Sequence, residues 1–219
     1  MTAPALRAIV FDLDGTLIDS RHDLAEAVNR TRRDLGLPGL ELAQVMGMVG
    51  RGARELVRRA LGGDPGEALL ERALAAFLAH YEPICTERTR PYPGVPELLA
   101  EEAGKRPLAL LTNKPERATR RILEHFGWTS HFRHVIGGDT PGARKPSPDG
   151  LLEIARRLDL APRELILVGD SPIDLETAAA AGASFVLVEW GFPSAAERAA
   201  ISGVPRAADV ATLRRRLAG

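Results

Sequence analysis

Two carboxylates stand one residue apart near the start of the chain. Asp12 and Asp14 follow an apolar run at residues 8–11, which predicts a short buried strand. In open α/β sheets, ligands bind just past the carboxyl ends of the strands. Side chains at positions i and i+2 of an extended chain point the same way, so both carboxylates are predicted to face one crevice.

Two like charges in one crevice need a compensating charge. At a separation of ~4 Å and an effective dielectric constant near 20, their repulsion costs about 4 kcal/mol. A divalent cation between Asp12 and Asp14 is the simplest remedy. The plainer alternative is that both are turn residues before Gly15, because Asp-Gly commonly ends a strand.

Two further apolar runs, at 108–111 and 165–168, also end in polar residues, and a lysine precedes a predicted helix start between them. The polar residues at these places are Thr112, Asn113, Lys145 and Asp170. Carboxylates, a hydroxyl and a cation together form the set that phosphoryl transfer requires.

These motifs, in this order, resemble the haloacid dehalogenase superfamily and specifically its phosphatases. The residues that carry the resemblance are Asp12, Asp14, Gly15, Thr16, Thr112, Lys145, Gly169, Asp170 and Asp174. Within the family, residues 18–20, 137–139 and 189–192 are most similar to the phosphoglycolate phosphatase branch.

The resemblance implies a role for each matching residue. Asp12 is the expected nucleophile, which forms an aspartyl phosphate and so divides one slow hydrolysis into two displacements. Asp14 is the expected general acid and base. Thr112 is expected to donate its hydroxyl to a phosphoryl oxygen, and Lys145 to offset the charge of the phosphate and the nucleophile.

The resemblance also implies Mg²⁺ as the cofactor, and no organic cofactor. Asp12, the backbone carbonyl of Asp14 and Asp170 are the expected ligands, since Mg²⁺ favours oxygen donors. Asp174 is expected in the metal's outer shell or beside Lys145. Thr16 and Asn113 are expected to contact the substrate or to support the residues that do.

The predicted fold class is α/β, a Rossmann-like doubly wound parallel sheet with an inserted all-helical cap. Residues 1–16 and 86–219 are assigned to the catalytic core and residues 17–85 to the cap. Within the cap, helices are predicted from Asp19 or Ser20 to about residue 35, over 52–61 and over 65–81. From residue 91 onward, strands and helices alternate as in a parallel sheet.

A glycine-rich turn at residues 47–52 has Arg51 at its centre. A simple break between helices explains the glycines equally well. Because an arginine fork pairs with two carboxylate oxygens, Arg51 or the nearby backbone amides are expected to recognise a carboxylate on the substrate. Lys114 is expected to support a helix start or the rim of the site.

The predicted reaction is the Mg²⁺-dependent hydrolysis of 2-phosphoglycolate to glycolate and phosphate. The first alternative is a phosphatase for a sugar phosphate, a nucleotide or pyrophosphate. A β-phosphoglucomutase-like isomerase is disfavoured because Leu24 stands where its cap histidine is expected, and Asp14 argues against a dehalogenase. A phosphonatase needs a cap lysine, which residues 17–85 lack. The other class considered is a non-catalytic binding protein.

Composition narrows the function classes further. The 219 residues include 29 basic and 29 acidic residues, a balance that argues against a nucleic-acid partner. Cys85 is the single cysteine, which excludes an intrachain disulfide and suits a reducing cytoplasm. Neither a signal peptide nor a membrane span is predicted. The expected partner is a small phosphorylated metabolite, and the expected state is a monomer or homodimer.

Overall fold

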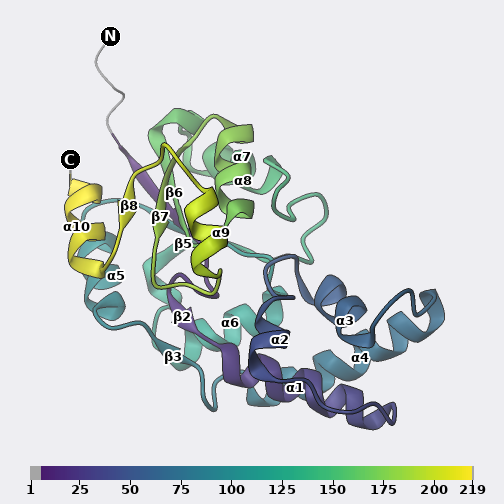
Figure 1. Cartoon of the computed structure of the whole chain (residues 1–219). Helices are drawn as coiled ribbons and strands as arrows, with labels where there is room; N and C mark the ends of the chain where they lie inside the picture. The colour runs from purple at the N-terminus through teal and green to yellow at the C-terminus, as the bar shows by residue number, and fades with distance from the viewer. Residues whose placement is uncertain (1–5, 219) are drawn as a thin grey trace.

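The computed structural model describes residues 6–218 as a parallel sheet with helices on both faces and a layer of helices at one end (Figure 1). The main sheet has the order β5-β4-β1-β6-β7-β8. Its strands are β1 (Ala8–Phe11), β4 (Leu108–Leu111), β5 (Phe132–Ile136), β6 (Leu165–Gly169), β7 (Ser184–Val188) and β8 (Arg206–Ala207). This is the α/β fold class predicted from the sequence.

Helices connect the strands of this sheet. They are α5 (Val95–Ala103), α6 (Glu116–His125), α7 (Asp149–Leu158), α8 (Pro172–Ala181), α9 (Ala195–Ala200) and α10 (Val210–Ala218), with the short 3-10 turns η1 (Thr129–His131) and η2 (Pro162–Glu164). Within the described chain, helix and strand alternate after β3, as the sequence predicts.

The central strand β1 is buried on both faces of the sheet. Ile9 and Phe11 pack into the core formed with α5, α6 and α10, whereas Ala8 and Val10 pack with α7 and α8. Alternate side chains of a strand point to opposite faces, so an apolar run without polar interruptions fits only a strand covered on both sides. This burial fixes the position of the residues that follow β1.

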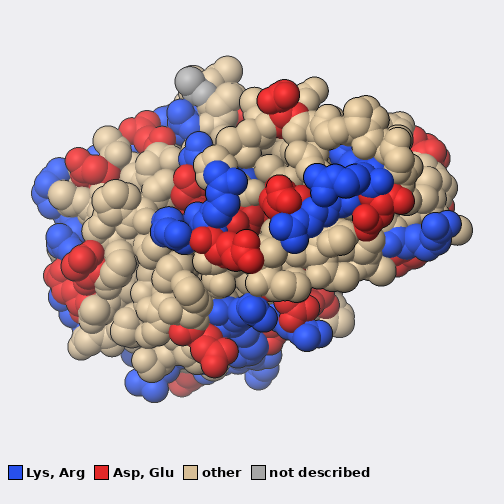
Figure 2. All heavy atoms as spheres, turned by 90° about the horizontal axis from the view of Figure 1, so that it is seen from below, with Lys and Arg blue, Asp and Glu red and all other residues tan. Residues whose placement is uncertain are grey.

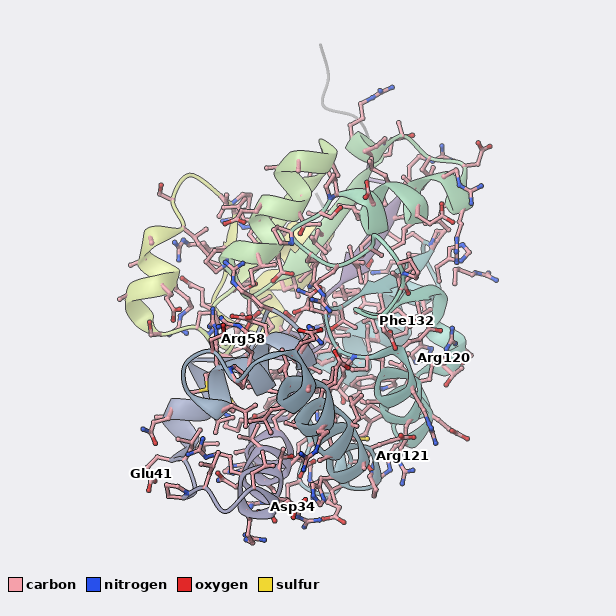
Figure 3. All side chains as sticks on the ribbon, turned by 90° about the vertical axis from the view of Figure 1, so that its right-hand side faces the viewer. Asp34, Glu41, Arg58, Arg120, Arg121 and Phe132 are labelled. Atoms are coloured by element: carbon pink, nitrogen blue, oxygen red, sulfur yellow. The ribbon has the colours of Figure 1, made fainter. Side chains whose placement is uncertain are left out.

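A second group of helices lies at the end of the molecule away from α7 and α8 (Figure 1). These are α1 (Arg21–Asp34), α2 (Leu42–Met46), α3 (Ala53–Leu61) and α4 (Glu67–Ile84). They leave and rejoin the sheet through the antiparallel strands β2 (Ile18–Asp19) and β3 (Arg90–Pro91). In Figure 3, Asp34 and Glu41 mark the part of this layer farthest from the sheet.

The predicted helices of this layer are present, with three differences. Helix α4 continues three residues beyond its predicted end and holds Pro83 in its last turn. The five-residue α2 and the two-residue strands β2 and β3 were not predicted, because segments so short show no readable periodicity. Ser20 is the N-cap residue of α1, but its hydroxyl bonds Asp14 instead of a helix amide.

The chain returning from the helical layer is fixed to α1 by one buried carboxylate. Asp23 accepts hydrogen bonds from the backbone amides of Arg88 and Thr89 and from the Thr89 hydroxyl, at 2.7–3.0 Å. Asp23 and Thr89 are both almost fully buried. Buried donors without partners are costly, so this carboxylate holds the two connecting segments together.

The structure bears on the expectations for the lone cysteine and for membrane spans. Cys85 is buried and free, as a lone cysteine must be within the chain. Among the helices described, none is long and apolar enough to cross a lipid bilayer. On the face shown in Figure 2, basic and acidic side chains are interspersed.

Replacement of Asp23 by alanine should lower the free energy of unfolding by about 2 to 4 kcal/mol, because three donors, two of them buried, lose their acceptor. Urea unfolding followed by circular dichroism measures this. Asp64→Ala is the matched control, since the exposed Asp64 carboxylate accepts one bond, from the Gly66 amide. Equal losses in the two variants would contradict the assigned role of Asp23.

Candidate active site

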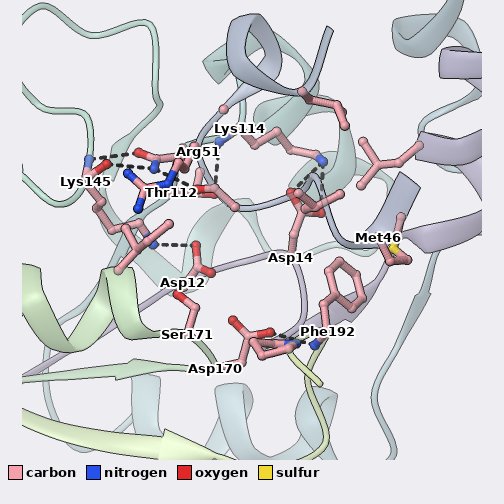
Figure 4. A pocket seen from close by; sticks show the side chains of 18 of the residues that line it. Asp12, Asp14, Met46, Arg51, Thr112, Lys114, Lys145, Asp170, Ser171 and Phe192 are labelled. Carbon is pink, nitrogen blue, oxygen red and sulfur yellow. Dashed lines mark hydrogen bonds and ion pairs between the residues drawn. The ribbon is translucent and has the colours of Figure 1, made fainter. Parts of the chain in front are cut away.

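The predicted site residues meet because three neighbouring strands end together. Phe11 of β1 pairs with Leu110 of β4 on one side and with Val168 of β6 on the other. Asp12, Thr112 and Asp170 therefore emerge from adjacent strands at the same edge of the sheet. The three side chains line one cavity (Figure 4).

Lys145 reaches this edge from the loop between β5 and α7. Its ammonium lies 2.8 Å from Asp12 Oδ1 and 2.5 Å from Asp174 Oδ1. The other oxygen of Asp174 accepts hydrogen bonds from the Ser171 hydroxyl at 2.6 Å and the Ser171 amide at 3.2 Å. Asp174 thus holds Lys145 in position, one of the two roles expected for it.

Asn113 fixes the backbone around Lys145. Its amide nitrogen donates to the Lys145 carbonyl at 2.9 Å, and its amide oxygen accepts from the Lys145 backbone N–H at 2.8 Å. The same nitrogen donates to the Gly50 carbonyl at 2.9 Å. One side chain therefore joins β4, the Lys145 loop and the glycine-rich turn of the helical layer.

Asp14 forms an ion pair with a second lysine, Lys114. Lys114 Nζ lies 2.9 and 2.7 Å from the two carboxylate oxygens of Asp14, and the Ser20 hydroxyl donates to the first of them at 2.5 Å. The expectation of one cation between Asp12 and Asp14 is therefore incomplete, because two different ammonium groups compensate the two carboxylates. Lys114 is buried in the site and does not lie on its rim, which corrects its predicted place.

Burial dominates the electrostatics of the carboxylates. It raises the pKa of Asp12 to about 6, although the charge of Lys145 opposes this shift. Burial, followed by the charges of Asp174 and Asp12, raises the pKa of Asp170 well above its usual value. Burial disfavours the charged form of Lys145, but Asp12 and Asp174 more than compensate, so its pKa is raised.

The sign of the Asp12 shift has a consequence for stability. Its pKa in the folded protein lies above its ordinary value of 3.8, so the folded state binds more protons between those two values. The contribution of this group to stability therefore falls as pH rises through that window. Near neutral pH, the ionised cluster favours any bound cation that offsets its charge.

The donor set fits a hard divalent cation. Carboxylate oxygens of Asp12, Asp170 and Asp174 lie within 4.8 Å of one another, and all three residues are buried. Because both oxygens of Asp174 are engaged by Lys145 and Ser171, Asp12 and Asp170 are the better ligands. Such hard oxygen donors suit Mg²⁺. The carboxylate of Asp14 is not in this cluster. The ligand atom expected from Asp14 is its backbone carbonyl oxygen.

Two glycines make room for Asp170. Gly15 has a φ of +83°, and a methyl group on it would overlap the Asp170 carboxylate. A methyl group on Gly191 would overlap the same carboxylate. The Phe192 amide donates to Asp170 Oδ2 at 2.8 Å (Figure 4). Asp170 is therefore held by close backbone packing on two sides.

The remaining predicted residues differ in position. The Thr112 hydroxyl accepts a bond from the Lys114 amide at 3.2 Å and keeps its own proton for a ligand. Thr16 is buried, its hydroxyl has no partner among the residues described, and it does not line the cavity. Arg51 is exposed and lines the cavity from the helical layer.

The cavity has a volume of about 540 Å³ and lies between the sheet edge and the helical layer. The sheet side contributes the charged residues described above. The helical layer contributes an apolar wall that includes Leu24, Phe77 and Tyr81, and the glycine-rich turn with Arg51. A small charged molecule in this space would contact both parts of the protein.

Comparison with known proteins decides the family. The model of the haloacid dehalogenase-like hydrolase family matches residues 6–182, which include every residue of the carboxylate and lysine cluster. The chain belongs to the haloacid dehalogenase-like hydrolases.

Individual relatives of this hydrolase are similar over most of its length. A phosphoglycolate phosphatase of Pseudomonas putida is 43% identical over 193 residues, which cover 85% of this chain and 70% of the relative. A phosphoglycolate phosphatase of Chromobacterium violaceum is 40% identical over 200 residues, which cover 89% of this chain and 90% of the relative. The crystal structure of a predicted phosphoglycolate phosphatase from Haemophilus somnus has a TM-score of 0.89 at 30% identity and covers 99% of both chains.

The sequence alone assigns no contact in this hydrolase's site to Ser20 or Tyr81. It identifies Ser20 as a helix cap and as part of the segment 18–20 that carries the resemblance, and Tyr81 as the predicted end of a helix. Lys114 did carry a signal, since the chain has three lysines and two of them, Lys114 and Lys145, belong to phosphate-site motifs. The contact of Lys114 with Asp14 joins residues 100 positions apart and has no local pattern.

If Asp170 is a Mg²⁺ ligand, Gly15→Ala should abolish Mg²⁺ binding, because the added methyl group displaces the Asp170 carboxylate. Thermal unfolding with and without Mg²⁺ measures this. A cation at about 100 times its dissociation constant should stabilise the wild type by about 2.7 kcal/mol, and this gain should vanish in the variant.

Gly36→Ala is the matched control. Gly36 also has a positive φ, of +70°, but a methyl group there meets nothing within 4 Å. This variant should lose stability from backbone strain and still be stabilised by Mg²⁺. Full Mg²⁺ stabilisation in Gly15→Ala would contradict the assignment of Asp170 as a ligand.

Proposed function

We propose that this hydrolase cleaves 2-phosphoglycolate to glycolate and phosphate through an aspartyl phosphate on Asp12. The observation that carries the proposal is the pairing of two carboxylates with two lysines in one cavity. Lys145 holds Asp12 and Lys114 holds Asp14. The relatives named phosphoglycolate phosphatase, at about 40% identity, support this substrate.

In the first half-reaction, an Asp12 oxygen attacks the phosphorus atom and the bond from phosphorus to the ester oxygen breaks. Asp14 gives a proton to that departing oxygen. The Lys145 ammonium and the Thr112 hydroxyl stabilise the negative charge on the phosphoryl oxygens. Glycolate leaves, and the phosphoryl group remains on Asp12.

In the second half-reaction, water attacks the phosphorus atom of the aspartyl phosphate. Asp14, now ionised, accepts the proton of that water, and the Asp12 carboxylate is released as the leaving group. The ion pair with Lys114 holds the Asp14 carboxylate in the cavity for this step. Phosphate then departs and the site returns to its initial state.

Mg²⁺ is the proposed cofactor, with Asp12, Asp170 and the backbone carbonyl of Asp14 as its ligands. When bound, it supplies positive charge that lets an anionic nucleophile approach an anionic phosphate. The clustering and burial of Asp12 and Asp170 support this choice, since their mutual repulsion is relieved by a cation.

The helical layer is the proposed cap, with its domain at residues 17–85 and the core at 1–16 and 86–219. It covers the cavity and would keep bulk water away from the aspartyl phosphate until the second step. Arg51 and Asn113 both line the cavity and are proposed to contact the substrate. Arg51 does so from the cap side, and Asn113 lies beside the glycine-rich turn, where it donates to the Gly50 carbonyl. Thr16 is proposed to support the loop that follows β1, and Asp174 is proposed to support Lys145.

The residues that line the cavity also rank the alternative functions. A phosphatase for another small ester uses the identical core, and only the cap side of the cavity separates it from the proposed function. A mutase is disfavoured by Leu24, which lines the cavity as an apolar residue. A non-catalytic protein has no physical need for a buried carboxylate cluster.

The remaining proposals concern the partner, the cellular location and the oligomeric state of this hydrolase. A small phosphorylated metabolite is the proposed partner, and a cytoplasmic location agrees with a free, buried cysteine. The proposed state is a monomer or homodimer.

Phosphate release from a panel of esters tests the proposed function. At equal concentration with Mg²⁺, kcat/KM for 2-phosphoglycolate should exceed that for glucose 6-phosphate, AMP and pyrophosphate by at least about tenfold, because only 2-phosphoglycolate among these carries a carboxylate for the basic side chains of the cavity. EDTA should stop release, and added Mg²⁺ should restore it.

Asp12→Asn is the control for the chemistry, and it should reduce release by at least about 1,000-fold while the fold is retained. If another ester is preferred, the substrate is wrong and the mechanism stands. If no ester is cleaved, or Asp12→Asn is fully active, the proposed function itself is contradicted.

A further inference from the structure

Lys114 is an unusual lysine because its side chain is 2% exposed. Its ammonium contacts both oxygens of Asp14 and also lies 4.7 Å from the centre of the Tyr81 ring. A lysine ammonium has three N–H groups, and the two Asp14 oxygens account for two of them. Asp14 and the Tyr81 ring face are the partners found for it among residues 6–218.

Among the described residues, four basic side chains line this cavity, and two of them, Arg51 and Arg59, are at least partly exposed to solvent. Within the described chain, Lys114 and Lys145 are the buried cations that line it. Lys145 is engaged by Asp12 and Asp174 at the phosphate end. Lys114 is therefore the buried cation at the Asp14 end.

The Asp14 end is where the non-phosphate part of a substrate must lie. Asp14 has to reach the ester oxygen in order to protonate it, so the substituent on that oxygen begins beside Asp14. In 2-phosphoglycolate, the carbon on the ester oxygen carries the carboxylate directly. That carboxylate is thus brought close to the ammonium that already contacts Asp14.

The surroundings of Lys114 strengthen its attraction for an anion. Tyr81, Phe77 and Leu24 form an apolar wall there, and in a poorly solvated site a charged hydrogen bond is worth more than in water. The Tyr81 hydroxyl is buried with no hydrogen-bond partner among the described residues.

Arg51 is placed differently. It is exposed, and in Figure 4 it lies on the side of Lys145 and Thr112, away from Asp14. From that position it faces the phosphate end of the cavity. The sequence-based expectation that Arg51 receives the carboxylate is thus less well supported than the same role for Lys114.

We propose that Lys114 binds the carboxylate of the substrate and thereby selects phosphate esters of small 2-hydroxy acids. This inference rests on the proposed function. It makes Lys114 a specificity-determining residue that contacts Asp14 in the empty site and the substrate in the complex.

The test compares 2-phosphoglycolate with ethyl phosphate, which has the same number of carbons and no carboxylate. The measured quantity is the ratio of the two kcat/KM values. Lys114→Met should lower this ratio by about 10- to 100-fold, the effect of losing one charged hydrogen bond. Any effect of Lys114 exerted through Asp14 acts on both esters and cancels in the ratio.

Two further variants complete the test. Lys105→Met is the matched control, because Lys105 is a surface lysine paired with Glu101 and Glu102, and its ratio should equal that of the wild type. Lys114→Arg keeps the positive charge and should retain most of the ratio. If Lys114→Met does not fold, Lys114→Gln gives the same comparison. Competitive inhibition by glycolate should weaken in parallel with the ratio.

The outcomes separate the two claims. A wild-type enzyme that cleaves ethyl phosphate as well as 2-phosphoglycolate contradicts the proposed function and the inference together. A wild-type preference that survives in Lys114→Met and Lys114→Gln overturns the inference alone. A preference that collapses in Arg51→Ala but not in the Lys114 variants assigns the carboxylate to Arg51 and also overturns it.

Discussion

The site depends on one buried ammonium between two buried carboxylates. Lys145 joins Asp12, at the end of the central strand, to Asp174, in the first turn of α8. Removing charges from water is costly unless they are closely paired and hydrogen bonded. Burial raises the pKa of Asp12 and Asp170, and the pairing leaves carboxylate charge in excess, which raises both further. A cation and a phosphoryl group fit a site with that imbalance.

The rest of the architecture can be understood as support for this cluster. The parallel sheet brings three strand ends together, and burial of β1 on both faces prevents Asp12 from shifting. Asn113 fixes the Lys145 backbone and bonds the glycine-rich turn at Gly50. The position of the helical layer and the position of Lys145 are thereby linked through one amide side chain. Asp23 performs a comparable task where the chain returns to the sheet.

The two lysines divide the cavity into two ends. At the proposed phosphate end, Lys145 contacts Asp12 and Asp174. At the other end, Lys114 contacts Asp14 and faces the helical layer, where relatives with the same core would be expected to differ. This division gives a physical reason why a shared mechanism can accompany different substrates.

The sequence predicted the parts of the site that follow from strand ends. Asp12, Thr112 and Asp170 each follow an apolar run, so their meeting could be inferred from sheet topology. The pairing of Asp14 with Lys114 and Ser20 could not, because it depends on the conformations of the loops that follow β1 and β4, which show no local pattern. The same limit applies to β2, β3 and α2, which are too short to show a period and are fixed by tertiary contacts.

The central claim is that Asp12 carries the phosphoryl group during turnover. Acid quenching of the enzyme with Mg²⁺ and 2-phosphoglycolate, followed by mass spectrometry of its peptides, measures this directly. The account predicts one added phosphoryl group on the peptide that contains Asp12, absent when EDTA is present. Turnover without that modification, or with the phosphoryl group on another residue, would contradict it.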